Sequence, residues 1–261
     1  MVEDKKLSEH DIETESRIFK KYAEICQKKK HICAECREKN PEILRVNQGL
    51  PVSFFTVGVD MNELKNRVMF VGKTVTYNWG PKADPPDPID KESGVIDARY
   101  ASDRLVFRQE PFFKCITDIC RLLWKEENLK LEEIWRRIAV TNFTKCSNSN
   151  EGWEAKTTDS MKDNCLEVGF LEAELKEAKP THLIFFTGPS YDNQIKKLLD
   201  IKYEIIDEPN NRNRKWWTVK PEENKIKTPV LRINNPYFIQ FFTSDEKRQF
   251  YQKISSWIKK S

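Results

Sequence analysis

A short apolar run, Ile138 to Val140, follows two arginines and ends at Thr141 and Asn142, where polar side chains take over. A run of this length between polar residues is typical of a buried strand. In open α/β sheets, ligands bind beyond the carboxyl ends of the strands. An amide, a lysine and a cysteine that follow such a strand are therefore expected to form a functional site, and a plain polar loop is the alternative.

Three further apolar runs predict strands of the same sheet, and amphipathic patterns between them predict helices. The expected strands are 67–74, 138–140, 182–188 and 229–234, with a possible short strand within 52–57. The expected helices are 8–30, 111–124, 159–179, 191–199 and 244–260. We therefore expect an α/β fold, a three-layer α/β/α sandwich with a mostly parallel four-stranded central sheet.

Four of the seven cysteines, Cys33, Cys36, Cys146 and Cys165, form a pattern of their own. The Cys33-Ala-Glu-Cys36 pair places two thiolates within reach of one metal, and the segment between Cys146 and Cys165 leaves room for a loop that returns a second pair. A tetrahedral zinc and four unrelated buried thiols are the alternatives. Cys26 falls within the amphipathic pattern of the first helix, which favours a core role for it.

These motifs resemble the iron-sulfur branch of the uracil-DNA glycosylase superfamily. In that branch a CxxC near the N-terminus joins a cysteine in a TN-x-x-KC motif and another cysteine further on. Here the pieces read CAEC, then TNFTKC at residues 141–146, then Cys165, and the similarity continues through ELKEAKPTHLIFFTG at 174–188. The resemblance implies a single uracil-DNA glycosylase-like domain over residues 1–261, with an N-terminal segment that helps to bind a 4Fe-4S cluster.

The resemblance also implies roles in base recognition. Asn142 would read the Watson-Crick edge of an extruded pyrimidine with its amide, and Phe112 would stack on the base. Gly72 begins the first active-site motif. For Phe112, a plain hydrophobic staple at the start of a helix is the alternative.

Five residues are candidates for contact with DNA. Lys145 is expected to reach a phosphate, and Phe238 to be an apolar wedge that fills the space left by a flipped nucleotide. Arg212, Arg214 and Trp216 lie in an insert where arginines alternate with tryptophans, a composition that grips phosphates and stacks on bases. The alternative for the insert is a hairpin that packs its tryptophans inward and leaves its arginines in water.

Two catalytic motifs of the superfamily are changed. After Gly72, Lys73-Thr74-Val75 stand where relatives carry an acidic or amide residue and usually a proline. Asn235 stands where most relatives have a histidine, and its amide can donate a hydrogen bond to a base oxygen but cannot carry positive charge. Asn78 and Asp84, in the long Pro-rich loop 76–110, are candidates for stabilising an oxocarbenium-like sugar and orienting water. A solvated lid is the alternative for this loop.

Composition restricts the cellular compartment and the partners that can be expected for this chain. The chain has 261 residues, 33% of them charged, and a net charge of only +4, so any contact with nucleic acid must come from local basic clusters. An odd number of cysteines and a polar N-terminus argue against a secreted disulfide framework and favour the cytoplasm. No apolar run has the length of a membrane span, so we expect no membrane partner.

These features predict an enzyme that flips a modified pyrimidine out of DNA and cleaves its N-glycosidic bond, leaving an abasic site. The changed motifs favour a base with a bulky modification, as in anti-phage members of the superfamily. Uracil excision in DNA repair is one alternative, and a DNA-binding module that has lost catalysis is another. The expected partner is DNA, and the protein is expected to be a monomer.

Overall fold

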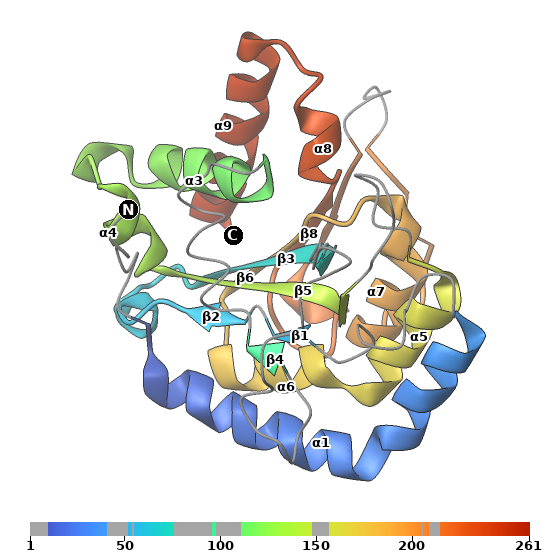
Figure 1. Cartoon of the computed structure of the whole chain (residues 1–261). Helices are drawn as coiled ribbons and strands as arrows, with labels where there is room; N and C mark the ends of the chain where they lie inside the picture. Colours follow the sequence, from blue (N-terminus) through green and yellow to red (C-terminus); the bar gives the residue numbers. More distant parts are fainter. Residues whose placement is uncertain are drawn as a thin grey trace, which may run out of the picture.

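The computed structural model describes residues 10–40, 52–53, 55–75, 96–97, 111–147, 157–204, 206–208 and 215–261. At 52–53, 75, 96–97 and 146–147 it describes the course of the backbone only. Within these residues the chain is a mixed α/β fold built on one large sheet (Figure 1). A small parallel pair, β1 (Val52–Ser53) and β4 (Ile96–Asp97), forms a separate two-stranded sheet beside β5 (Ile138–Ser147).

The large sheet is mixed and has six strands, in the order β2-β5-β3-β6-β8-β7. Their bounds are β2 (Thr56–Val57), β3 (Val68–Val75), β5 (Ile138–Ser147), β6 (His182–Phe185), β7 (Trp216–Val219) and β8 (Val230–Ile233). The pairs β3–β5, β3–β6 and β6–β8 are parallel, whereas β2 and β7 add antiparallel edges. The expected count of four strands is therefore wrong: β2, which lies within the possible strand 52–57, and β7 each add an antiparallel strand at an edge of the four parallel strands.

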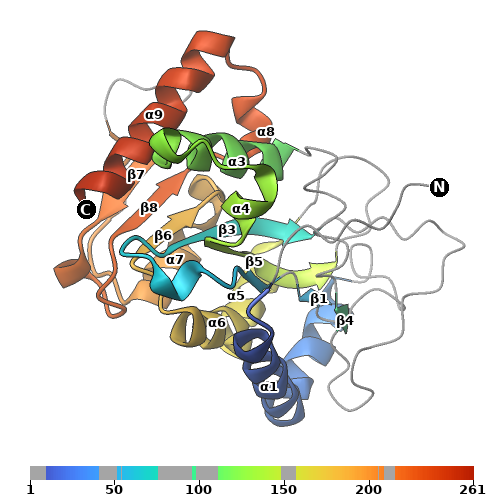
Figure 2. The ribbon, with the colours of Figure 1, turned by 90° about the vertical axis from the view of Figure 1, so that its left-hand side faces the viewer.

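Alternation along β3 divides the core into two layers, one on each face of the sheet. Met69 and Val71 pack towards α1 (Ile12–Lys39), α5 (Asp159–Val168), α6 (Phe170–Ala178) and α7 (Asp192–Leu199). Val68 and Phe70 pack towards α3 (Pro111–Leu123), α4 (Leu131–Trp135), α8 (Pro236–Ile239) and α9 (Ser244–Lys260). Both views show these two groups of helices on opposite sides of the sheet (Figures 1 and 2). Because both faces are covered, β3 and β6 read as continuous apolar runs.

Helix α1 is longer than the sequence pattern indicates. Asp11 caps its first turn by accepting a hydrogen bond from the backbone of Thr14, and the helix kinks at Lys29, where φ is −123° and ψ is 22°. After the kink it continues to Lys39, so that Cys33 and Cys36 both lie in its last turns. The CAEC motif is therefore helical, with its two sulfurs one turn apart on one face.

The expected helix 159–179 is two helices. Gly169 adopts φ +90°, a left-handed conformation that ends α5 and begins α6 in a new direction. The remaining elements are single turns of 3-10 helix, η1 (Met61–Glu63), η2 (Lys125–Glu127), η3 (Pro189–Tyr191) and η4 (Pro221–Glu223). Over the described residues, none of the helices combines the length and the apolar character that crossing a membrane requires.

His182, the first residue of β6, predicts a pH dependence of stability. Its side chain is buried, packs edge-on against Trp257 at a centroid distance of 5.6 Å, and lies 3.0 Å from the hydroxyl of Thr181. Burial lowers the pKa of His182 to about 4. The unfolded chain binds the proton more readily, so acid favours unfolding.

We expect the free energy of unfolding to fall by up to about 3 kcal/mol as the pH drops from about 6.5 to about 4, apart from the contributions of other groups. His182→Gln removes the titrating ring and should flatten this part of the profile in urea titrations at several pH values. His31→Gln is the matched control, because His31 is exposed on α1. An unchanged slope in the His182 variant would contradict the prediction.

Candidate functional site at the carboxyl edge of the sheet

The carboxyl ends of β3, β5, β6 and β8 meet at one edge of the sheet. Gly72 of β3 is the register partner of Asn142 in β5. On the other side of β3, the backbone N–H of Phe186 donates to the carbonyl of Val71 at 2.8 Å. The N–H of Gly188 donates to the carbonyl of Ile233 at 2.8 Å, which holds the end of β6 against the end of β8. The side chains at this edge are therefore held on a rigid frame.

Gly72, Asn142 and Phe112 come together at this edge. A Cβ at Gly72 would lie 2.3 Å from Oδ1 of Asn142 and 3.2 and 3.3 Å from two ring carbons of Phe112. Any side chain at Gly72 would therefore displace the Asn142 amide, so glycine allows this close approach. The three residues that the sequence assigns to base binding are thus neighbours in space, although they come from β3, β5 and α3.

Phe112 reaches the edge from the first turn of α3. Its ring makes edge-to-face contacts with Phe186, at a centroid distance of 5.7 Å, and with Phe113, at 5.2 Å. The side chain is only partly buried. A partly exposed aromatic ring can stack on a planar ligand.

Asn235 follows β8 and begins α8. Its Oδ1 accepts a hydrogen bond from the backbone N–H of Tyr237 at 3.0 Å, so the side chain caps the helix. Its backbone lies against Gly188, which adopts φ +65°. Because Oδ1 is turned towards the helix, the amide N–H₂ group is the part that can donate to a ligand.

Large apolar side chains are exposed next to Asn235. Phe238 in α8 is 59% exposed, and Phe241, just beyond the helix, is 80% exposed. Tyr237 is 40% exposed. The position of Phe238 suits the expected wedge.

The predicted contact between Lys145 and a DNA phosphate is wrong. Lys145 is buried, and its ammonium lies 2.6 and 2.8 Å from the two carboxylate oxygens of Glu174 in α6. Thr141 donates to the same carboxylate at 2.9 Å, and the hydroxyl of Tyr22 in α1 donates to it as well. Burial lowers the pKa of Lys145, and Glu174 opposes that shift. Lys145 is a structural cation, because strand alternation places its side chain on the face of the sheet opposite to that of Asn142.

Trp216 is also not a DNA contact. It lies in β7, is buried, and packs edge-on against Phe250 of α9 at a centroid distance of 6.2 Å. The ammonium of Lys253 lies 4.0 Å from the centre of its ring. The alternative expected for the insert, tryptophans packed inward, therefore holds for Trp216. The other predicted site residues in loops, Asn78, Asp84, Arg212 and Arg214, lie outside the described residues.

The cysteines of α1 and α5 lie close together. Cys36 and Cys165 share a small buried cluster with Met161. Burial raises the pKa of Cys33 to about 12, and the nearby thiols of Cys165, Cys26 and Cys36 add to this shift. Among the described side chains, no set of three or more His, Cys, Asp or Glu is arranged to hold a metal, and the side chain of Cys146 is outside that set.

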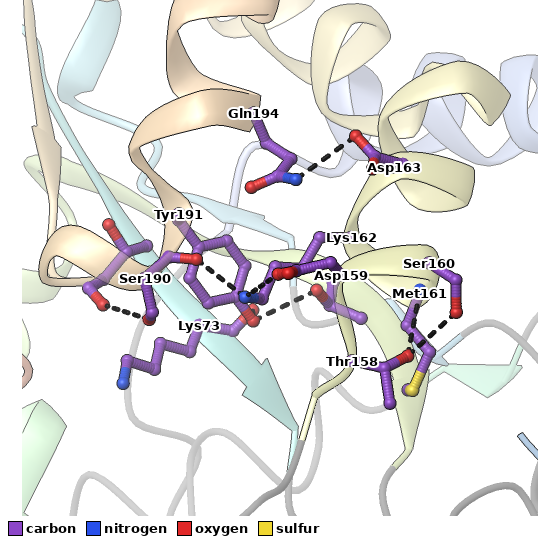
Figure 3. A network of polar contacts seen from close by, with 12 residues as sticks. Lys73, Thr158, Asp159, Ser160, Met161, Lys162, Asp163, Ser190, Tyr191 and Gln194 are labelled. Carbon is purple, nitrogen blue, oxygen red and sulfur yellow. Dashed lines mark hydrogen bonds and ion pairs between the residues drawn. The ribbon is translucent and has the colours of Figure 1, made fainter.

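A polar network fastens α5 to the carboxyl edge (Figure 3). The ammonium of Lys162 lies 2.8 Å from a carboxylate oxygen of Asp159 and 2.6 Å from the carbonyl of Ser190. It also lies 4.9 Å from the centre of the Tyr191 ring. The Tyr191 hydroxyl in turn donates to the carbonyl of Lys73 at 3.4 Å. The helix that carries Cys165 is thereby tied to the residue that follows Gly72.

Sequence reasoning missed Arg232, a fully buried residue within β8. Its guanidinium donates to Asp192 at 2.8 Å and to Asp207 at 2.6 Å, and lies 6.0 Å from the centre of the Trp217 ring. Burial raises the pKa of Asp192 to about 6, against the effect of Arg232. The one sequence feature that could have indicated a buried ion pair is the single arginine inside the apolar run of β8. Its ion pairs hold α7 and the 206–208 segment against β8, the strand that leads to Asn235.

The chain matches no protein-family model and none of the curated proteins. The chemistry of the edge follows from its residues: an amide and a glycine on paired strands, an aromatic ring over them, and a second amide after β8. An amide offers both a donor and an acceptor to the edge of a heterocyclic base. An aromatic face provides a stacking surface for the same base.

Proposed function

We propose that this protein is a DNA glycosylase that flips a modified pyrimidine out of DNA and hydrolyses its N-glycosidic bond. The observation that carries the proposal is the convergence of Asn142, Phe112 and Gly72 at the carboxyl edge of the sheet. Each of these residues has a separate origin in the chain and a separate use in reading an extruded base. A purely structural edge has no need for a glycine that makes room for an amide.

In this proposal each residue of the edge has one task. The Asn142 amide reads the Watson-Crick edge of the base, and the ring of Phe112 stacks on it. The Asn235 N–H₂ group donates to the base oxygen on which negative charge develops as the bond breaks. Phe238, which is exposed, enters the DNA stack where the nucleotide leaves it. Asn78 and Asp84 remain the candidates for orienting water.

We also propose a 4Fe-4S cluster held by Cys33, Cys36, Cys146 and Cys165. The proximity of Cys33, Cys36 and Cys165 supports this ligand set, since thiolates of cysteine are the usual ligands of such clusters. The cluster would supply a structural cross-link between α1, α5 and the end of β5. The test is the colour and the metal content of the purified protein. We expect brown protein that contains thiolate-bound iron. Colourless protein with stoichiometric zinc would show that the site binds zinc and not an iron-sulfur cluster.

The fold is in keeping with the superfamily that the motifs resemble. Its parallel strands β5, β3, β6 and β8 lie side by side, and helices cover both faces. We propose that these strands are the four-stranded core of a uracil-DNA glycosylase-like sandwich, to which β2 and β7 are added. We further propose that the protein acts as a cytoplasmic monomer.

The test is a base-release screen with the full-length protein. Duplex and single-stranded DNA containing uracil, hydroxymethylcytosine or glucosylated hydroxymethylcytosine are incubated with the protein and then treated with alkali. Strand breaks at the modified position are expected, because alkali cleaves abasic sites. Release of the bulky base favours phage defence, and release of uracil alone favours repair. If the protein binds DNA but releases no base from any substrate, the enzyme proposal is wrong and the protein is a DNA-binding module.

A further inference from the structure

Lys73 lies where the order of the strands reverses. It belongs to β3, and the next strands of the large sheet in chain order pair on its two sides, β5 on one and β6 on the other. Among the described residues, the first helix after β3 is α3 and the first after β6 is α7, and these two helices cover opposite faces of the sheet (Figures 1 and 2). In open α/β sheets, ligands bind outside the carboxyl ends of the strands at such a reversal. Lys73 therefore lies at the part of the edge where a ligand is expected.

The strand that carries Lys73 continues past the end of β6. The last register pair between the two strands is Val71 with Phe185, whereas β3 goes on pairing with β5 beyond this point. Beside Lys73 the place of β6 is taken by η3, because the hydroxyl of Tyr191 donates to the Lys73 carbonyl at 3.4 Å. The same hydroxyl lies 3.2 Å from that of Thr144 in β5. The backbone of Lys73 is thus held in place at the edge of the sheet.

The side chain of Lys73 is half-buried and takes a different direction from these backbone contacts. It extends away from the network of Lys162, Asp159 and Thr158 that fastens α5 (Figure 3). Strand alternation starts it on the face of the sheet opposite to that of Gly72. A lysine carries its amine on a flexible four-carbon stem, however, and the pairing of β3 with β6 has already ended. The amine can therefore reach past the strand ends to the side of the edge where the candidate site lies.

A primary amine at this edge has a reaction partner in the product of base release. The abasic sugar opens to an aldehyde at C1′, and lysine amines form Schiff bases with carbonyl substrates. The neutral amine adds to C1′, and water leaves as the C=N bond forms. C2′ then loses a proton to water, the electrons of that bond form the C2′–C3′ double bond, and the C3′–O bond breaks, so that the phosphate leaves with its electron pair. Hydrolysis of the imine returns the lysine.

We propose that Lys73 gives this protein a second activity, cleavage of the DNA strand at an abasic site through a covalent imine. The inference goes beyond base release and rests on the proposed function only for the origin of the abasic sugar. It gives a task to the lysine that follows Gly72, which has none in base recognition. Lys73 contacts the reacting carbon in this step, so it is a catalytic residue of the second activity.

The test uses the full-length protein and duplex DNA with one preformed abasic site, so it does not require base release. Sodium borohydride reduces an imine to a stable amine, which links the protein to the DNA and gives a slower band in a denaturing gel. Lys73→Arg keeps the positive charge, but a guanidinium stays protonated and forms no imine. Lys65→Arg is the matched control, because Lys65 is exposed and precedes β3 at the opposite edge of the sheet.

We expect wild-type and Lys65→Arg protein to form the borohydride-dependent complex and to cut abasic DNA without alkali. Lys73→Arg should lose both, because the nucleophile is gone. Thermal unfolding of each variant shows whether a loss reflects lost structure. Mass spectrometry of peptides from the trapped wild-type complex is an independent readout, and it should find the reduced sugar on Lys73.

The outcomes separate this inference from the proposed function. Wild-type protein that releases a base but neither traps nor cuts abasic DNA would overturn the second activity and leave the glycosylase standing. A complex that Lys73→Arg still forms, or a sugar found on another lysine, would overturn the role of Lys73. Trapping through Lys73 without release of any base would support the inference and overturn base release alone.

Discussion

Replacing Lys145 with methionine is expected to lower the free energy of unfolding by about 3–5 kcal/mol, because it leaves a buried carboxylate without its cation. Glu174 is fully buried and accepts hydrogen bonds from Lys145, Thr141 and Tyr22. Without Lys145, it must either remain charged in an apolar core or take up a proton. Urea denaturation of the variant and the wild type, followed by circular dichroism, measures the difference.

A double substitution separates the cost of a lone charge from the value of the pair. Lys145→Met combined with Glu174→Leu removes both charges and should recover part of the stability that either single change loses. Lys21→Met is the matched control, since its partner Glu24 lies on the surface of α1 and both side chains are about half exposed. We expect the control to change stability little. Equal losses for Lys145→Met and Lys21→Met would contradict the role of burial.

Replacing Asn142 with alanine is expected to lower the rate of base release about 100-fold or more, on whichever base the screen identifies. The amide lies beside Gly72 at the carboxyl edge, and its loss removes the donor and acceptor that read the base. Gly72→Ala should lower the rate as well, since its Cβ would lie 2.3 Å from Oδ1 of Asn142 and push the amide aside. Single-turnover rates and thermal unfolding of each variant make the comparison.

The double variant Gly72→Ala/Asn142→Ala tests whether the two residues act together. If Gly72→Ala works through the Asn142 amide, the double variant should be no slower than Asn142→Ala alone. Additive losses would show that Gly72 acts on something else. Asn193→Ala, an exposed amide on α7, should leave the rate unchanged. Unaltered base release by Asn142→Ala would remove Asn142 from base recognition.

Much of the framework could be predicted from the sequence. The strands β3, β6 and β8 and the helices α3, α7 and α9 lie within a few residues of their expected ranges. These are the elements with the clearest apolar runs or the strongest amphipathic pattern, because they are covered on both faces or on one whole side. Gly72, Asn142 and Phe112, which the resemblance assigns to one site, are neighbours in the structure.

Other parts could not be predicted, for identifiable reasons. The strand expected at 138–140 continues as β5 to Ser147, so that Asn142 and Lys145 lie in the strand and not in a loop after it. Thr141 and Lys145 satisfy their hydrogen bonds with Glu174 on α6, which is distant in sequence. A prediction based on apolar runs ends such a strand too early, because the hydrogen-bond partners of its polar residues become apparent only in the folded structure.

Local sequence alone determined where the chain forms its clearest apolar strands and amphipathic helices. Those properties depend on spacing along the chain, which the sequence contains in full. Only the tertiary structure decided that Lys145 faces a buried Glu174 while Asn142 faces Gly72 and Phe112. In a sequence pattern, a lysine and an asparagine both count simply as polar residues. Only the fold shows on which face of the strand each one lies and which residue it contacts there. That difference makes Lys145 a structural cation and places Asn142 at the candidate site.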